Sequence, residues 1–366
     1  SGARGKANGH DETWSNTKVE AGNQLKLKSG GDTTLKGAVA TGHQVSADIG
    51  GHLLIESLQD SSRYDSKQQS IGGSLTIGPT MNASINASKS KINSNYLSVI
   101  EQSGIKAGNG GFDIKVGGNT TLTGGAITST QAAIDNSLNR FNTGGTLTLT
   151  ALTNRAEYKA TSVGINVGSG FSAQGALTPG GTSAGFGRDK GNALSMTFAG
   201  ISGLAGNKAA RTGDAETGIA RIFNADKVQK EINAQTQITQ TFGREAPKAI
   251  ANYAGDRAIE LRKQGKEAEA QKWDEGGMYR LALHTAAGAL AGGLEGATGA
   301  AATASTAKIL NEFQDTLAKN LKLSGVNAKA ANSAAQIIAN ITSTGIGAAA
   351  SGGSVIGASM GLNIDA

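Results

Sequence analysis

Short stretches in which aliphatic and polar residues alternate recur through the first half of the chain. Residues 50–55, 72–77 and 144–149 each begin with a glycine pair, and aliphatic residues then follow two positions apart. This alternation buries one face of a β-strand and exposes the other, and glycine pairs favour turns. The glycine pairs that begin at residues 30, 50 and 72 lie about twenty residues apart, a spacing typical of the coils of a solenoid.

A longer repeat supports the solenoid. The sequence GGDTTLKG at residues 30–37 recurs as GGNTTLTG at residues 117–124, and an alternating strand precedes each copy. In a solenoid, the short strands of each coil pair with those of the next coil, and their inward Leu, Ile and Val side chains form one core. We therefore predict an elongated right-handed parallel β-helix over residues 1–175, with a β-sandwich as the competing all-β fold.

The second half of the chain changes character. Residues 176–214 are rich in glycine and contain no long periodic run, so we predict a Gly-rich linker there. Over residues 215–366 the spacing of apolar positions becomes helical, which predicts an α-helical domain rich in glycine and alanine. Within that domain, we expect Gly243 to end one helix and Pro247 to occupy the first turn of the next.

Two stretches of the helical domain contain the candidate functional residues. Residues 281–307 carry a single charged side chain, Glu295, and residues 330–364 carry none. In a helix, glycines spaced four apart share one face, and another backbone can approach that face closely. Two interpretations stay open, namely tightly packed helices of a soluble domain or a hairpin that enters a membrane. The glycines with this spacing are Gly288, Gly292 and Gly296 in the first stretch and Gly353, Gly357 and Gly361 in the second.

Composition and charge exclude several kinds of site and partner. Cysteine is absent, which excludes disulfides, thiol catalysis and cysteine-ligated metals. The net charge of +6 is not gathered into a basic run, so we expect no nucleic-acid partner. The chain begins without Met and shows no signal peptide, so we expect it to be a piece of a longer polypeptide.

No arrangement of catalytic residues stands out. Asp32 and Asp113 lie at repeat positions where a turn or solvated role is sufficient, although two carboxylates on neighbouring coils could form a carbohydrate-cleaving site. We therefore predict no catalytic residue, no cofactor and no metal. Four histidines show no spacing typical of metal ligands: His10, His43, His52 and His284.

The repeats also carry a family resemblance. The sequence NSNYLSVIEQSGIKAG at residues 93–108, followed by GGFDI at 110–114 and the GGNTTL turn, resembles the haemagglutinin-repeat region of filamentous-haemagglutinin-like exoproteins. The resemblance covers roughly residues 20–175. In the helical half, IARIF at 219–223, DKVQKE at 226–231 and GLNIDA at 361–366 are similar to the pretoxin region of CdiA-type carriers of contact-dependent growth inhibition.

The resemblance implies a function that the residues alone do not show. Such proteins are exported by two-partner secretion through an outer-membrane transporter and are found outside the cell or on the bacterial surface, passing through the periplasm during export. The repeat region is implicated in engaging the outer membrane of a target cell, and the pretoxin region (residues 215–366 here) in translocating a C-terminal toxin. We expect that toxin to lie outside this chain. The alternatives are a filamentous-haemagglutinin-type adhesin stalk and a β-helix carbohydrate enzyme.

Overall fold

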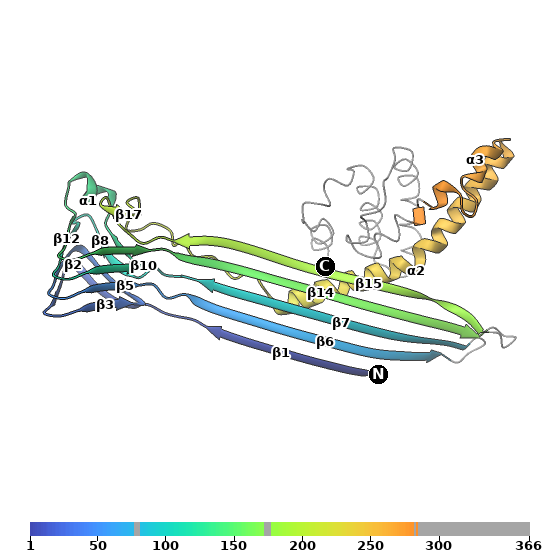
Figure 1. The fold of residues 1–366 in the computed structure, drawn as a ribbon, viewed down its shortest axis with the longest axis horizontal. Coiled ribbons are helices and arrows are strands. Elements are labelled where there is room, and N and C mark those ends of the chain that lie inside the picture. Colours follow the sequence, from blue (N-terminus) through green and yellow to red (C-terminus); the bar gives the residue numbers. More distant parts are fainter. Residues whose placement is uncertain (77–80, 172–176, 282, 285–366) are drawn as a thin grey trace.

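The computed structural model describes residues 1–76, 81–171, 177–281 and 283–284. Two mainly parallel sheets stack at one end of the molecule, and a long antiparallel sheet extends from them (Figure 1). A single long helix, α2, packs against this antiparallel sheet. The described part of the chain is therefore rich in sheet and has few helices.

The two stacked sheets consist of short strands from successive coils of the chain, and we call this region the coil stack. Most of its strands pair in parallel, as the repeats predict, and the final strand, β17, pairs antiparallel with β16. A short helix, α1 (Gln131–Asp135), follows one of the strands. The strands are β2 (Thr17–Ser29), β3 (Thr33–Lys36), β4 (Ala38–Ile49), β5 (Leu53–Glu56), β8 (Gly104–Ala107), β9 (Phe112–Val116), β10 (Thr120–Thr123), β11 (Ala126–Thr128), β12 (Arg140–Thr143), β13 (Leu147–Thr150), β16 (Gly200–Ile201) and β17 (Ala205–Gly206).

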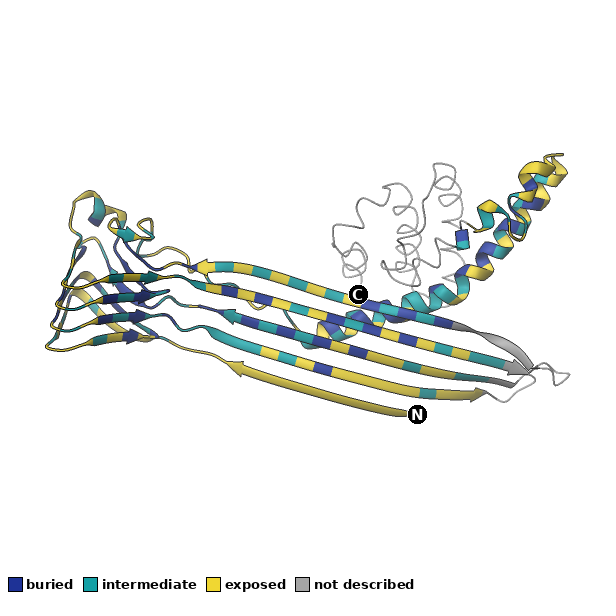
Figure 2. Cartoon of the chain, in the orientation of Figure 1, coloured by how far each residue is buried: buried dark blue, intermediate teal, exposed yellow. Residues whose placement is uncertain are grey.

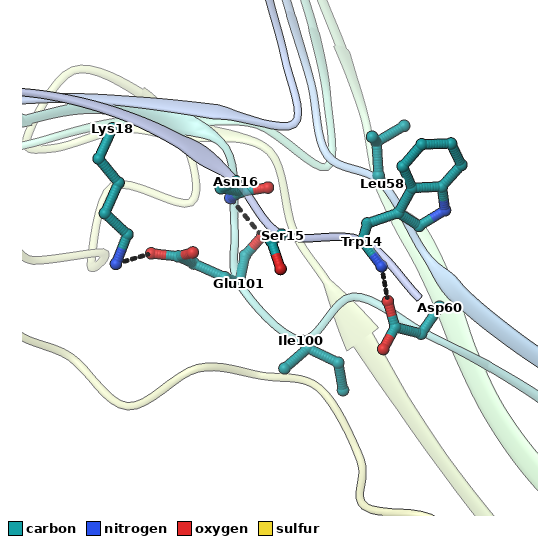
Figure 3. Close-up of a pocket in the computed structure, with 8 residues that line it drawn as sticks. All are labelled: Trp14, Ser15, Asn16, Lys18, Leu58, Asp60, Ile100 and Glu101. Atoms are coloured by element: carbon teal, nitrogen blue, oxygen red, sulfur yellow. Dashed lines mark hydrogen bonds and ion pairs between the residues drawn. The ribbon is translucent and has the colours of Figure 1, made fainter. Parts of the chain in front are cut away.

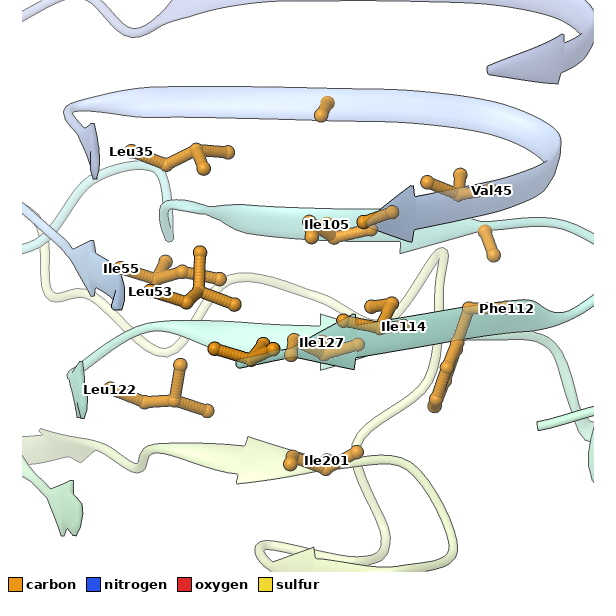
Figure 4. Close-up of a cluster of buried hydrophobic side chains, with 14 of the residues drawn as sticks. Leu35, Val45, Leu53, Ile55, Ile105, Phe112, Ile114, Leu122, Ile127 and Ile201 are labelled. Carbon is orange, nitrogen blue, oxygen red and sulfur yellow. The ribbon is translucent and has the colours of Figure 1, made fainter. Parts of the chain in front are cut away.

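The register of the coil stack confirms the repeat. The smaller sheet has the order β13-β10-β5-β3, so the two copies of the long repeat contribute β3 and β10 on either side of β5. Equivalent aliphatic residues then stand in one column, in which Leu35 and Leu122 both lie opposite Ile55. These side chains point into the core shown in Figure 4, together with Val45, Phe112 and other buried residues. Burial of this apolar surface is the main force that holds the coils together.

The antiparallel sheet arises where the chain leaves the coil stack and returns to it. After β5 the chain runs out along β6 and back along β7, and after β13 it runs out along β14 and back along β15. The two hairpins lie side by side and β1 completes the edge, giving the order β1-β6-β7-β14-β15. We call this the long sheet. Its strands are β1 (Gly2–Glu12), β6 (Asp60–Thr76), β7 (Met81–Ser98), β14 (Leu152–Phe171) and β15 (Leu177–Thr197).

The long sheet corrects two of our predictions. An elongated parallel β-helix through residues 1–175 is wrong for β1, β6, β7 and β14, because these strands pair antiparallel. The glycine pair at Gly72 and Gly73 makes no coil turn, since it lies inside β6 opposite Asn86 and Ile85. An alternation with period two is the same for both strand directions, so the sequence pattern could not distinguish them.

The predicted linker over residues 176–214 is also wrong in part, because this range contains strand β15. Its glycines are compatible with a strand here because the neighbouring helix lies very close to the sheet. A Cβ atom at Gly187 would stand 2.1 Å from the backbone oxygen of Ile232. The division of the chain into three domains stays a prediction.

Helix α2 (Ala225–Lys263) begins at Asn224, whose side chain accepts a hydrogen bond from the backbone N–H of Lys227. The predicted break between Gly243 and Pro247 is wrong, since the helix continues through both. Phe242 before the proline and Ile250 after it are both buried, so packing along one face outweighs the local cost of proline. A short helix, α3 (Glu267–Gln271), follows.

Candidate functional site

A ladder of hydrogen bonds joins the turns of the coil stack. The backbone N–H of His52 donates to Oδ1 of Asp32 over 2.7 Å. The N–H of Asn119 donates to Nδ1 of His52 over 2.8 Å, and the N–H of Thr146 donates to Oδ1 of Asn119 over 2.8 Å. Each side chain therefore satisfies a backbone donor in the next coil, and His52 acts as an acceptor within a structural ladder.

The glycine pairs beside this ladder allow the side chains to reach across. A Cβ atom at Gly51 would stand 2.2 Å from Oδ1 of Asp32, and one at Gly145 would stand 2.1 Å from Oδ1 of Asn119. Real Cβ atoms do not approach so closely, so any larger residue would displace the ladder. The predicted turn role of Asp32 is confirmed by its bond to His52.

A shallow pocket lies where β1, β6 and β7 join the coil stack (Figure 3). The backbone N–H of Trp14 donates to Asp60 over 2.8 Å, and Lys18 forms an ion pair of 3.1 Å with Glu101. The side chain of Asn16 donates to the backbone oxygen of Glu101. Both carboxylates are thus engaged in contacts that connect neighbouring strands. The pocket is a structural joint.

Helix α2 and the segment before it pack on one face of the long sheet, and the helix itself lies mainly against β14 and β15. Ile92 and Ala160 pack with Val228 and Ile232 in a small buried cluster. The helix also protects the edge of the sheet, because the backbone N–H of Arg188 donates to Oε1 of Gln235 over 2.8 Å.

A group of polar side chains lies within this covered face. The hydroxyl of Tyr158 donates to Asp189, and burial together with the Asp189 charge raises the pKa of that hydroxyl above its usual range. Burial, followed by the charge of Asp189, also raises the pKa of Glu231. Ionised Glu231 therefore opposes the docking of the helix.

The opposite face of the long sheet is not covered by any described residue, and we call it the open face. Several apolar side chains on this face are largely exposed to solvent. The exposed fraction is 64% for Ile71, 61% for Leu75 and 60% for Ile85. Val163, Ile165 and Val167 of β14 lie on this face as well, and all three are exposed. Figure 2 shows buried and exposed residues alternating along β7 and β14, whereas the edge strand β1 is exposed along its whole length.

The remaining sequence candidates do not converge. Asp113 lies in β9 between Ser46 and Arg140 of the neighbouring strands, away from the turn that contains Asp32. Within residues 1–76, 81–171, 177–281 and 283–284, no three His, Asp or Glu side chains gather as metal ligands. No helix in that part of the chain is long and apolar enough to cross a membrane. Six candidate glycines lie outside the described residues: Gly288, Gly292, Gly296, Gly353, Gly357 and Gly361.

The histidines occupy unrelated places. His10 lies in β1 opposite Arg63, and His43 lies at the bend of β4 beside Gly110. His284 is half-buried, and burial followed by the charge of Arg280 lowers its pKa.

Comparison with known proteins gives the family. The family described as "Hemagglutinin repeat" matches residues 1–71. A "Toxin CdiA" of Escherichia coli is 40% identical over 266 residues, which is 66% of this chain. A "Deoxyribonuclease CdiA" of Dickeya dadantii (strain 3937) is 35% identical over 75% of the chain, and a "tRNA nuclease CdiA" of Escherichia coli (strain NC101) is 43% identical over 46%.

The chain is short beside these relatives. The matches span 8% of the length of the first relative, 9% of the second and 5% of the third. No solved structure matches the chain. The repeat match and the similarity to several CdiA proteins agree with the repeated turns and the paired strands seen in the fold. The chain is a haemagglutinin-repeat protein of the CdiA type.

Proposed function

We propose that this chain is a non-catalytic delivery part of a contact-dependent growth-inhibition carrier. It engages the envelope of a target cell and assists translocation of a C-terminal toxin that is not part of this chain. The observation that carries the proposal is the long sheet, a single layer that extends from the coil stack, with α2 packed on one face and the other face open. Asp32 in the coil stack and Asp189 in the long sheet both accept hydrogen bonds that support the fold.

The proposal includes the finer features of fold and partners. The coil stack winds as a right-handed parallel β-helix, and its turn ladder keeps the coils in register. The carrier is secreted by two-partner secretion through an outer-membrane transporter, passes the periplasm and stays at the cell surface. Its partners are that transporter, the outer membrane or lipid of the target cell and the attached toxin, and it has no nucleic-acid partner.

The helical part would act after the first contact. In this proposal residues 215–366 form the pretoxin domain, and close helix packing at the glycines spaced four apart assists translocation. Helix α2 connects this domain to the long sheet through the buried contact of Ile232 with the sheet. Docking of α2 is therefore the step through which the sheet and the toxin-bearing end would be coupled.

A matched pair of substitutions in the full-length carrier tests the proposal. Ile232→Asp introduces a charge at a fully buried position, and Asn233→Asp introduces the same charge at the exposed neighbouring position. We expect both variants to reach the cell surface and to bind target cells. Only Ile232→Asp should lose growth inhibition in mixed culture.

The alternative role, an adhesin stalk, gives a different outcome. A stalk needs no coupling between α2 and the sheet, so inhibition by Ile232→Asp at the level of the unsubstituted carrier would reject the delivery role. Surface display, measured by antibody labelling of intact cells, separates these outcomes from a simple failure to fold or to be exported.

A further inference from the structure

A row of basic side chains crosses the open face of the long sheet. Lys6 in β1 lies directly opposite Lys67 in β6, and Lys67 lies opposite Lys91 in β7. The row continues through Thr161 in β14 to Arg188 in β15. Side chains directly opposite each other on neighbouring strands share a face, and these strands are about 4.8 Å apart. Three ammonium groups are therefore held close together.

The two neighbouring rows extend this basic character. Arg4 and Lys89 lie in the row nearer the tip of the sheet, and Lys159 and Lys190 lie in the row nearer the coil stack. Asp65 is the one carboxylate in the three rows among the described residues, and the side-chain amide of Asn93 donates to it. We call these three rows the basic band.

The basic band is costly for the folded protein unless an anion occupies it. Like charges directly opposite each other destabilise a sheet. Lys6, Lys67 and Lys91 are all exposed, and no described carboxylate forms an ion pair with any of them. The lysines also line a shallow groove of about 340 Å³, together with Asn8, Asp65 and Asn93. Ammonium and amide groups around such a groove are suitable donors for phosphate oxygens.

The surface next to the basic band is apolar. Beyond the band, on the same face and toward the tip of the sheet, lie Ile71, Leu75, Ile85, Ile165 and Val167. All five are between 45% and 64% exposed. A basic band beside exposed aliphatic residues matches the boundary of a bilayer, where phosphate groups border the acyl chains.

We propose that the open face docks onto a bilayer that carries anionic phosphate headgroups. The groove formed by Lys6, Lys67 and Lys91 binds the phosphates, and the aliphatic side chains of Ile71 and Leu75 enter the acyl boundary. The inference deepens the proposed function, since it assigns the surface that meets the target envelope. A second copy of the chain is a poorer occupant because two basic bands would repel each other. A nucleic acid would leave the aliphatic residues without a partner.

Vesicle flotation with the full 366-residue chain tests this surface. Vesicles of phosphatidylcholine alone would be compared with vesicles that contain one third phosphatidylglycerol, at low and at high salt. A lysine near an anionic surface strengthens binding roughly five-fold. The variant Lys67→Gln/Lys91→Gln should therefore bind anionic vesicles about 25-fold more weakly. The control Lys26→Gln/Lys208→Gln removes the same charge from exposed positions of the coil stack and should bind like the unsubstituted chain.

A second variant tests the apolar part of the surface. Ile71→Ser/Leu75→Ser should weaken binding to anionic vesicles and leave its salt dependence unchanged, because the basic band is intact. Circular dichroism of each variant confirms that the sheet has formed. Since all these positions are exposed, the substitutions remove no buried contact.

Several results would overturn the inference. Equal binding to both vesicle types, equal weakening by the two lysine variants, or concentration-dependent dimers that disappear in Lys67→Gln/Lys91→Gln would each do so. These results are separable from failure of the proposed function. A carrier with Lys67→Gln/Lys91→Gln that inhibits target cells normally contradicts only the lipid surface, whereas normal inhibition by Ile232→Asp contradicts the delivery role.

Discussion

The ladder of hydrogen bonds that joins the turns of the coil stack predicts that substitutions at Asn119 and Gly145 are not additive in their effect on stability. Substituting Asn119→Ala removes the oxygen that accepts the N–H of Thr146 over 2.8 Å. Loss of one such bond should lower the free energy of unfolding by about 1 kcal/mol. Substituting Gly145→Ala places a Cβ atom 2.1 Å from the same oxygen, so the Asn119 side chain must rotate away and the same bond is lost. This variant should also cost about 1 kcal/mol.

The double variant should then cost about 1 kcal/mol as well, instead of the sum of about 2 kcal/mol. Once Asn119 is truncated, the next contact of the new Cβ is the Asn119 backbone nitrogen at 3.2 Å, which requires only a small shift. Urea unfolding of the four proteins, monitored by circular dichroism, measures these free energies. The slope of the free energy of unfolding against urea concentration should be the same in all four, so that a shift of the midpoint reports a change in stability.

The neighbouring coil provides the control. At Gly51 the new Cβ would stand 2.2 Å from Oδ1 of Asp32 and also 2.7 Å from its backbone nitrogen. Truncating Asp32 cannot relieve the backbone contact, so Gly51→Ala should cost about 1–3 kcal/mol with or without Asp32→Ala. Additive effects of Asn119→Ala and Gly145→Ala, to within about 0.4 kcal/mol, would refute the reasoning.

Three further predictions follow from single contacts. His52→Ala removes the acceptor of the Asn119 N–H and should lower the free energy of unfolding by about 1 kcal/mol. His52→Asn supplies an amide oxygen as acceptor and should recover part of this loss. Equal losses for the two variants in urea unfolding would contradict an acceptor role for His52. Ile232→Ala, at a fully buried site, should cost about 2–5 kcal/mol, whereas Asn233→Ala, at an exposed site, should change urea unfolding by less than about 0.5 kcal/mol. Glu231→Gln should raise the melting temperature at pH 7, because burial and Asp189 raise the pKa of Glu231 and its ionised form costs stability above that pKa. This advantage should disappear as the pH falls below the usual glutamate pKa of 4.5, and a constant difference across that range would show that charge is not the cause.

The sequence by itself determined the local elements and their chemistry. The glycine pairs and the alternating residues after them predicted the short strands of the coil stack, and the long repeat predicted that β3 and β10 are equivalent. The absence of cysteine excluded disulfides and thiol chemistry. The helical spacing of apolar positions after residue 215 predicted helical structure, and α2 lies in that range with Val228, Ile232 and Phe242 buried and Ile238 only partly so. These properties depend on residues close together in the chain.

Only the tertiary structure decided how the strands pair. Strand direction and register belong to pairs of strands, so the alternating pattern of β6 or β14 could not reveal that the chain turns back and pairs antiparallel. The same limit hid the basic band, because Lys6, Lys67 and Lys91 are far apart in the sequence and only cross-strand register brings them into one row. Helix α2 likewise continues through Pro247 because burial along its face outweighs the local preference to stop. Packing between distant segments settled each of these features.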